Sequence, residues 1–213
     1  MLTDSASGDD APSVVLIDPF VVSEFLKDSV ENYLESLRTA AARDTPQFMP
    51  RTWGLLFGRV ECDAMRLESV RFAANVRETS DVALAEFDEV IVPCFGAAYA
   101  NKGRGFWCDP AELLSLTREA EAEGMELLGS LHLHPDWHQI GPPHERRQRV
   151  SEQPTEMDEY LFRNTGWPVN MICYLESRGS EIVHTFAAWS PPSFDDPASR
   201  AAELPIRFRV GTI

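Results

Sequence analysis

Apolar residues recur along the chain with two different spacings, and these spacings predict an alternation of strands and helices. Val22, Leu26, Val30 and Tyr33 follow one another at three- or four-residue steps, which places them on one face of a helix. A short apolar run such as Trp53–Val60 is instead typical of a buried strand. The predicted strands are 14–17, 53–60, 65–76, 82–95, 126–134, 169–175 and 181–188, and the predicted helices are 19–43, 109–124 and 155–164.

Residues that favour helix ends support these boundaries. Asp18 and Asp109 each precede a proline that would occupy the first helical position. Gly124 and Gly166 follow the second and third predicted helices, where a left-handed residue commonly closes the last turn. The pattern therefore predicts an α/β fold in which helices and strands alternate, with hairpins between some of the strands.

The chain has 213 residues, which fits one domain at about 150 residues per domain. Residues 1–13 are polar and rich in Ser, Asp and Gly, and this composition predicts a disordered N-terminal tail. Residues 14–190 are expected to form the domain. Residues 191–213, which include a segment rich in Pro and Asp, are expected to be a peripheral C-terminal tail.

The charge of the chain argues against two classes of partner. It carries 19 basic and 34 acidic residues, a formal net charge of −15. Such a chain lacks the Lys and Arg excess that neutralises nucleic-acid phosphates or anionic membranes. No apolar run approaches the ~20 residues of a membrane span, and the N-terminus does not resemble a signal peptide. The four cysteines form no CxxC pair. We expect a cytoplasmic protein with reduced thiols.

Four of the five histidines lie between positions 132 and 144. His132 and His134 are two residues apart on a predicted strand, so both imidazoles point to the same face, about 7 Å apart at the backbone. Pro135 ends that strand because it cannot donate a ladder hydrogen bond. Two imidazoles on one face can converge on a metal ion.

A third ligand is expected from the helix that follows. Asp158 lies on its first turn, and two histidines with one carboxylate form a catalytic zinc arrangement that leaves a position open for water. A metal in such a site lowers the pKa of a water molecule and polarises a carbonyl oxygen.

Each of these residues also has an ordinary structural interpretation. A single histidine is more often exposed or hydrogen-bonded than a ligand, and Thr155 with Asp158 can form a simple helix capping box. It is the combination that favours a metal site. Two other metal folds carry related motifs, the all-β cupin and the amidohydrolase barrel with HxHxD on its first strand. The predicted helices argue against the first, and the short chain with a late motif argues against the second.

The motifs resemble those of the JAB/MPN-domain (JAMM) metalloproteins. That family carries a Glu before a GLLxG strand, then HxHP at a strand end, then SxxD opening a helix. Here the corresponding segments are 54–58 (GLLFG), 132–135 (HLHP) and 155–158 (TEMD). The resemblance covers roughly residues 14–190.

The resemblance implies a curled mixed β-sheet flanked by helices, similar to the cytidine deaminase-like architecture. It also implies one zinc ion per chain, held by His132, His134 and Asp158. Thr155 would take the position of the family's Ser and stabilise an oxygen that develops charge. The implied activity is hydrolysis of an amide or isopeptide bond in a protein or peptide substrate, often after the C-terminal glycine of a ubiquitin-like protein. The resemblance does not define an oligomeric state.

One departure concerns the general base. The position of the family's Glu is occupied by Arg51, which stays protonated and cannot accept a proton. Loss of a general base typically costs 10²–10⁴ in rate. His138 and His144, close to the motif in sequence, are the candidate replacements.

A second departure is the long segment between Pro135 and Thr155, which contains three arginines on an acidic protein. It is interpreted either as a solvated surface loop or as a lid or partner-binding element suited to an acidic ligand. Two functional hypotheses remain open. The protein is either a zinc-dependent hydrolase of the JAMM type, or a catalytically degenerate MPN-like interaction module in which Arg51 has replaced the base.

Overall fold

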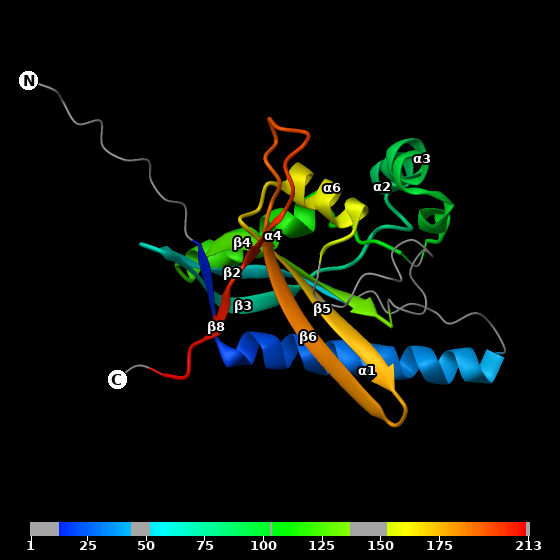
Figure 1. Cartoon of the computed structure of the whole chain (residues 1–213), viewed down its shortest axis with the longest axis horizontal. Coiled ribbons are helices and arrows are strands. Elements are labelled where there is room, and N and C mark those ends of the chain that lie inside the picture. Colours follow the sequence, from blue (N-terminus) through cyan, green and yellow to red (C-terminus); the bar gives the residue numbers. More distant parts are fainter. Residues whose placement is uncertain (1–12, 44–51, 103, 137–152, 212–213) are drawn as a thin grey trace, which may run out of the picture.

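A mixed sheet of eight strands organises the molecule (Figure 1). The computed structural model describes residues 13–43, 52–102, 104–136 and 153–211. The strands are β1 Val14–Ile17, β2 Trp53–Glu61, β3 Ala64–Phe72, β4 Glu126–Pro135, β5 Val169–Arg178, β6 Glu181–Ser190, β7 Ala202–Leu204 and β8 Ile206–Phe208. The helices are α1 Pro19–Arg43, α2 Asp81–Glu86, the π-helix η1 Phe87–Ile91, α3 Val92–Phe95, the 3-10 helix η2 Ala97–Ala100, α4 Pro110–Ala122 and α6 Glu156–Thr165.

The spatial order of the strands is β7-β6-β5-β4-β2-β3-β1-β8. The two outermost strands, β7 and β8, are separated in sequence by Pro205 alone. The sheet therefore curls until its edges nearly meet. Strand β4 lies antiparallel to β2 and parallel to β5, and α6 belongs to the connection from β4 to β5. This crossover places the carboxyl end of β4 beside the beginning of α6.

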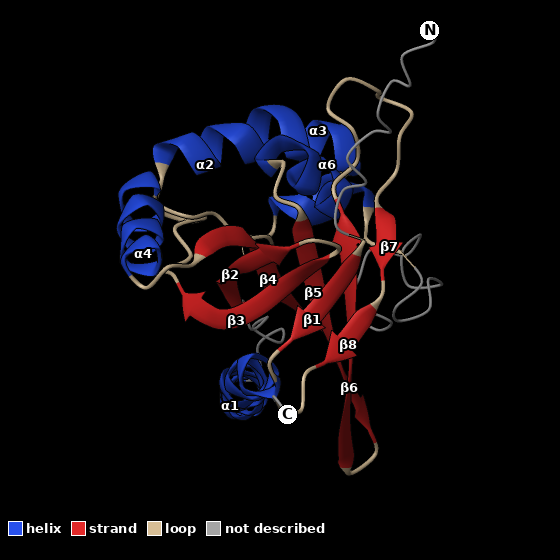
Figure 2. Ribbon diagram, turned by 90° about the vertical axis from the view of Figure 1, so that its left-hand side faces the viewer, coloured by secondary structure: helices blue, strands red, loops and turns tan. Residues whose placement is uncertain are grey.

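Helices cover both faces of the sheet (Figure 2). Helix α1 lies on one side, and α4 and α6 lie on the other. The largest buried cluster joins α1 to the sheet and includes Phe25 and Tyr33 together with Leu131 and Leu133 of β4. On the opposite face, smaller clusters join the sheet to α6 and to α4.

Strand β4 contributes to both faces because its side chains alternate. Leu131 and Leu133 pack toward α1, so Ser130, His132 and His134 point to the face that carries α4 and α6. The register against β2 skips Leu128, since Leu56 pairs with Gly129 and Phe57 pairs with Leu127. This β-bulge shifts the alternation by one residue. Leu128 therefore packs in the α1 cluster together with Leu131 and Leu133, and Leu127 packs in the α4 cluster.

Gly129 is the residue that lets β4 and β5 approach each other at this point. A Cβ atom at this position would lie 1.6 Å from the carbonyl oxygen of Val169. No larger residue fits without moving one of the two strands. The close pairing continues along β5, where His132 is opposite Ile172 and His134 is opposite Tyr174.

Asp136 ties the end of β4 to its surroundings. Its backbone has φ = 42°, a left-handed conformation that turns the chain after Pro135. The hydroxyl of Tyr33 on α1 donates to Oδ2 of Asp136, and Ser177 donates its backbone N–H (2.7 Å) and its hydroxyl (3.0 Å) to Oδ1. A buried carboxylate thus joins α1, β4 and β5 through hydrogen bonds to both of its oxygens.

The structure confirms the α/β class and most predicted elements. The helices expected at 19–43, 109–124 and 155–164 are present, as are strands that match 14–17, 53–60, 126–134, 169–175 and 181–188 within a few residues. The third predicted strand is shorter than expected and ends at Phe72. The N-terminal tail expected at 1–13 lies almost entirely outside the described residues. In the part that is described, no helix is long and apolar enough to cross a membrane.

The prediction of a strand at 82–95 is wrong, because this segment forms α2, η1 and α3. Its buried residues Ala83, Phe87 and Ile91 follow a four-residue spacing, which is helical, and the hydroxyl of Ser80 caps the first turn. The expectation of a merely peripheral segment at 191–213 also needs correction. β7 and β8 pair with β6 and β1, but each is too short to show an alternating pattern in the sequence.

The hydrogen bond between Tyr33 and Asp136 provides a test of this arrangement. The substitution Tyr33→Phe leaves a buried carboxylate oxygen without its donor, and we expect it to lower the free energy of unfolding by ~1–3 kcal/mol. Tyr160→Phe is the matched control, because it removes a phenol–carboxylate hydrogen bond to Glu86 at a partly exposed site. Urea denaturation measures both free energies of unfolding. Equal decreases in the two variants would contradict a special stabilising role of the buried hydrogen bond to Asp136.

The raised pKa of the same tyrosine predicts that the free energy of unfolding depends on pH. Burial and the hydrogen bond to Asp136 raise the pKa of Tyr33 from 10.0 to about 12. The folded state therefore holds this proton more tightly than the unfolded state. The contribution of Tyr33 to the free energy of unfolding is fully present below pH 10 and is lost as the pH rises toward 12. The stability difference between the wild type and Tyr33→Phe should narrow over this range, and a constant difference would count against the assignment.

Candidate metal centre

The carboxyl end of β4 brings two imidazoles together on the face of the sheet that carries α6. The Nε2 atoms of His132 and His134 lie 3.0 Å apart. Both side chains are buried, with 5% and 6% of their surface exposed. The strand geometry predicted for this pair is confirmed.

The first turn of α6 supplies a carboxylate to the same point. Asp158 is fully buried, and its Oδ1 lies 3.3 Å from Nε2 of His132 while its Oδ2 lies 3.6 Å from Nε2 of His134. One ligand atom from each of the three residues lies within 4.8 Å of the other two. Among the residues that the structure describes, this is the group of His, Cys, Asp and Glu side chains that could hold a metal ion.

Thr155 holds the carboxylate of Asp158 in place. Its backbone N–H (2.9 Å) and its hydroxyl (2.7 Å) both donate to Oδ2 of Asp158, and the hydroxyl accepts the N–H of Asp158 at 3.1 Å. This is the capping box expected from the sequence. It satisfies Oδ2 from the protein and leaves Oδ1 with no hydrogen-bond partner among the described residues. A buried carboxylate oxygen without a donor, next to two imidazole nitrogens, is what a bound cation would complete.

The hydroxyl of Thr155 has one proton, and that proton is engaged with Asp158. The structure therefore shows Thr155 as a positioning residue for the carboxylate. Its expected role in stabilising a charged oxygen stays a prediction.

The charges of the three residues suit a metal site. Burial lowers the pKa of His132 below its ordinary value of 6.5, against the opposing influence of Asp158. Burial alone would raise the pKa of Asp158, but the adjacent imidazoles of His134 and His132 lower it well below its usual range. At neutral pH this chain presents a neutral imidazole at position 132 and an ionised carboxylate at position 158, which are the forms that bind a metal ion.

Aromatic side chains surround the cluster, and the sequence alone did not indicate them. The ring centroid of Phe106 lies 5.0 Å from that of His132, and the centroid of Phe162 lies 6.3 Å from it. Tyr174 meets the ring of His134 edge-on at 5.5 Å. Burial raises the pKa of Tyr174 far above its ordinary value, so its hydroxyl keeps its proton. These rings limit the access of water and lower the local dielectric.

Three of the residues singled out from the sequence, Arg51, His138 and His144, lie outside the described residues. Asp136 lies inside them and is bonded to Tyr33 and Ser177 rather than joined to the metal-ligand cluster. The Asp of the HxHxD pattern is therefore not among the candidate metal ligands.

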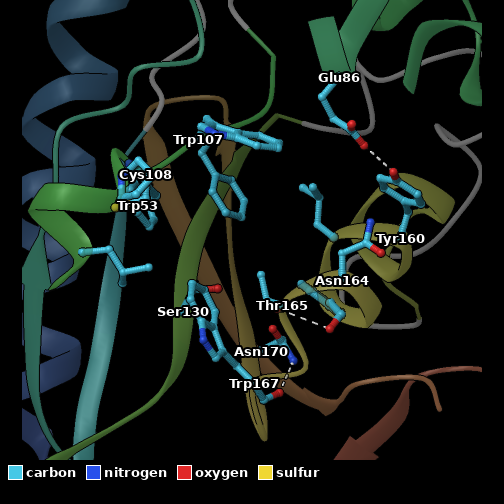
Figure 3. Close-up of a pocket in the computed structure, with 15 residues that line it drawn as sticks. Trp53, Glu86, Trp107, Cys108, Ser130, Tyr160, Asn164, Thr165, Trp167 and Asn170 are labelled. Atoms are coloured by element: carbon cyan, nitrogen blue, oxygen red, sulfur yellow. Dashed lines mark hydrogen bonds between the residues drawn. The ribbon is translucent and has the colours of Figure 1, made fainter. Parts of the chain in front are cut away.

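A cavity of about 320 Å³ adjoins the cluster (Figure 3). It lies between α6 on one side and β2, β4 and the segment before α4 on the other. It is lined by Trp53, Glu86, Phe106, Trp107, Cys108, Pro110, Leu113, Ser130, Tyr160, Leu161, Phe162, Asn164, Thr165, Trp167 and Asn170. Phe106 and Phe162, which flank His132, are therefore also walls of this cavity.

The comparisons with known proteins support the fold and go no further. No family model matches the chain, and no curated protein matches it. Among solved structures, the chain is similar to the solution structure of protein DSY2949 from Desulfitobacterium hafniense. The TM-score is 0.52 at 16% identity, over 92% of this chain and 93% of that one. This likeness extends over nearly the whole length of both chains and shows a shared fold.

The candidate metal centre leads to a prediction about the zinc content of the purified protein. We expect protein purified with added zinc to retain about one zinc ion per chain. His132→Ala and Asp158→Asn should each lose it, because each removes one of three ligands. His184→Ala is the matched control, since His184 is an exposed histidine on β6 and should leave the metal content unchanged.

Elemental analysis of the dialysed proteins measures this difference. The 3.0 Å separation of the two Nε2 atoms also suits a hydrogen bond in which one nitrogen carries a proton. If the wild-type protein contains no metal even after incubation with zinc, a hydrogen bond between the imidazoles rather than a metal ion holds the cluster together.

Proposed function

We propose that this protein is a zinc-dependent hydrolase of amide or isopeptide bonds with a JAB/MPN-like architecture. The observation that carries the proposal is the meeting of His132, His134 and Asp158 at the junction of β4 and α6. These are the three positions that the HxHP and TxxD motifs assign to zinc in the resemblance described above. The two motifs lie apart in the sequence, and the fold brings their candidate ligands together. This proximity supports the proposal that the two motifs act together.

The residues present fit zinc. Two imidazoles and one carboxylate, all buried, form the donor set of catalytic zinc sites. A zinc ion in this site would supply a Lewis acid that polarises the substrate carbonyl and lowers the pKa of water. The chain does the rest: His132 and His134 present Nε2 atoms, and Thr155 fixes the orientation of Asp158 through its two hydrogen bonds. Tyr174 keeps a hydroxyl proton beside His134, where it can donate to a charged oxygen.

A hydrolase also needs a proton acceptor, and Arg51 cannot serve as one. His138 and His144 remain the candidates that the sequence predicts. The structure adds Glu86, which lines the adjoining cavity and accepts a hydrogen bond from the hydroxyl of Tyr160. The same absence of the family's Glu favours the second candidate function, a metal-binding interaction module without turnover.

Activity assays distinguish the two functions. The substrates are a ubiquitin-like protein and short acyl-glycine peptides, each carrying a fluorescent amine in amide linkage at its C-terminus. We expect the zinc-loaded wild type to release the amine, Asp158→Asn to lose activity, and the control His184→Ala to keep it. Thr155→Ser should retain the activity, whereas Thr155→Val, which removes the hydroxyl donor to Asp158, should lower it by about 10–100-fold.

The opposite pattern would favour the interaction module. A zinc-loaded wild-type protein that releases no amine from any of these substrates would contradict the hydrolase. Activity that survives Asp158→Asn at the wild-type level would exclude the proposed centre as its source.

A further inference from the structure

Six of the fifteen residues that line the cavity beside the candidate metal centre are aromatic. Trp53 and Phe106 stack with ring centroids 5.2 Å apart and planes 16° from parallel. Trp107 and Trp167 are partly buried around the same space, and Phe162 closes it from α6. Its volume of about 320 Å³ lies at the lower end of the ~300–1,000 Å³ typical of small-molecule sites. The space therefore suits one compact group.

The cavity and the metal ligands lie on one face of the sheet. Ser130 lines the cavity and precedes His132 by two residues on β4, so its backbone lies about 7 Å from that of His132 on the same face. Trp53 is directly opposite His132 in the pairing of β2 with β4. A substrate whose amide reached the histidines would therefore carry its neighbouring side chain over the cavity.

The described part of the walls offers no positive charge to an anionic group. No Lys, Arg or His is among the lining residues in the part of the chain that the structure describes. Burial raises the pKa of the Cys108 thiol to about 11, so it is neutral, and the carboxylate of Glu86 adds negative charge at the side of Tyr160. An acidic side chain would lose its hydration there without gaining a counter-charge, whereas an aromatic ring would bury apolar surface against aromatic walls.

We propose that this cavity binds an aromatic side chain of the substrate next to the amide that is cleaved. The role in substrate selection rests on the proposed hydrolase function, but the binding of an aromatic group does not. The arginine-rich segment after Pro135 suggested an acidic ligand from the sequence. The cavity assigns a neutral aromatic group to the substrate position nearest the metal.

The binding can be measured without turnover. The neutral fluorophore N-phenyl-1-naphthylamine is titrated into the full chain, once with excess chelator and once with zinc. N-acetyl-phenylalanine amide, N-acetyl-glycine amide and N-acetyl-aspartate amide then compete with it. We expect saturable 1:1 binding of the fluorophore under both conditions. The phenylalanine compound should displace it at concentrations at least tenfold lower than the other two.

Two adjacent leucines on α4 provide matched variants. Leu113 lines the cavity, whereas Leu114 is half exposed and does not. Leu113→Trp should fill the space and weaken fluorophore binding at least tenfold, and Leu114→Trp should leave it within twofold. Thr165→Trp, at the more exposed end of α6, fills the cavity from the other side and should also weaken binding if Leu113→Trp fails to fold.

The two levels of the proposal fail differently. Absence of fluorophore binding to the wild type, or equal binding by Leu113→Trp and Leu114→Trp, would overturn the aromatic cavity even if amides are hydrolysed. If the zinc-loaded protein binds the fluorophore but shows no turnover, the proposed aromatic cavity is supported and the proposed hydrolase function is contradicted. Turnover that prefers phenylalanine over glycine and aspartate at this position, and that loses the preference in Leu113→Trp, would support both.

Discussion

The alternation of side chains along β4 is the constraint on which the rest of the structure depends. Leu131 and Leu133 enter the core under α1, and the residues between and beside them, His132 and His134, are thereby held on the opposite face. A slip of one residue would move the histidines into the core and the leucines into the metal site. Because the core strongly opposes such a slip, the packing of apolar residues fixes the position of polar ones.

The end of β4 and the start of α6 are each held by hydrogen bonds, which join distant parts of the sequence at Asp136 and neighbouring residues at Asp158. Asp136 ties β4 to Tyr33 and Ser177, and Thr155 ties Asp158 to the first turn of α6. These hydrogen bonds position Asp136 and Asp158 from within the protein, which is the kind of support that a preorganised site requires.

The parts of the structure that the sequence predicted are those encoded by local patterns. A capping box, a proline after HxH and apolar periodicity act over a few residues, so α1, β4, α6 and the three candidate ligands could be predicted. Residues 82–95 were misassigned because a dense apolar run hides its four-residue spacing. The cavity walls could not be predicted, because Trp53, Phe106 and Trp167 come from separate segments whose meeting depends on the sheet order.

We propose that the cluster holds one metal ion by two imidazoles and one carboxylate. X-ray absorption spectroscopy of the zinc-loaded protein measures these ligands directly. We expect two imidazole nitrogens at ~2.0–2.1 Å, carboxylate or water oxygens at ~2.0–2.2 Å and no sulfur. In Asp158→Asn the spectrum should change or the zinc should be lost. A sulfur shell at ~2.3 Å, or a spectrum without imidazole scattering, would place the zinc elsewhere on the protein and contradict this ligand set.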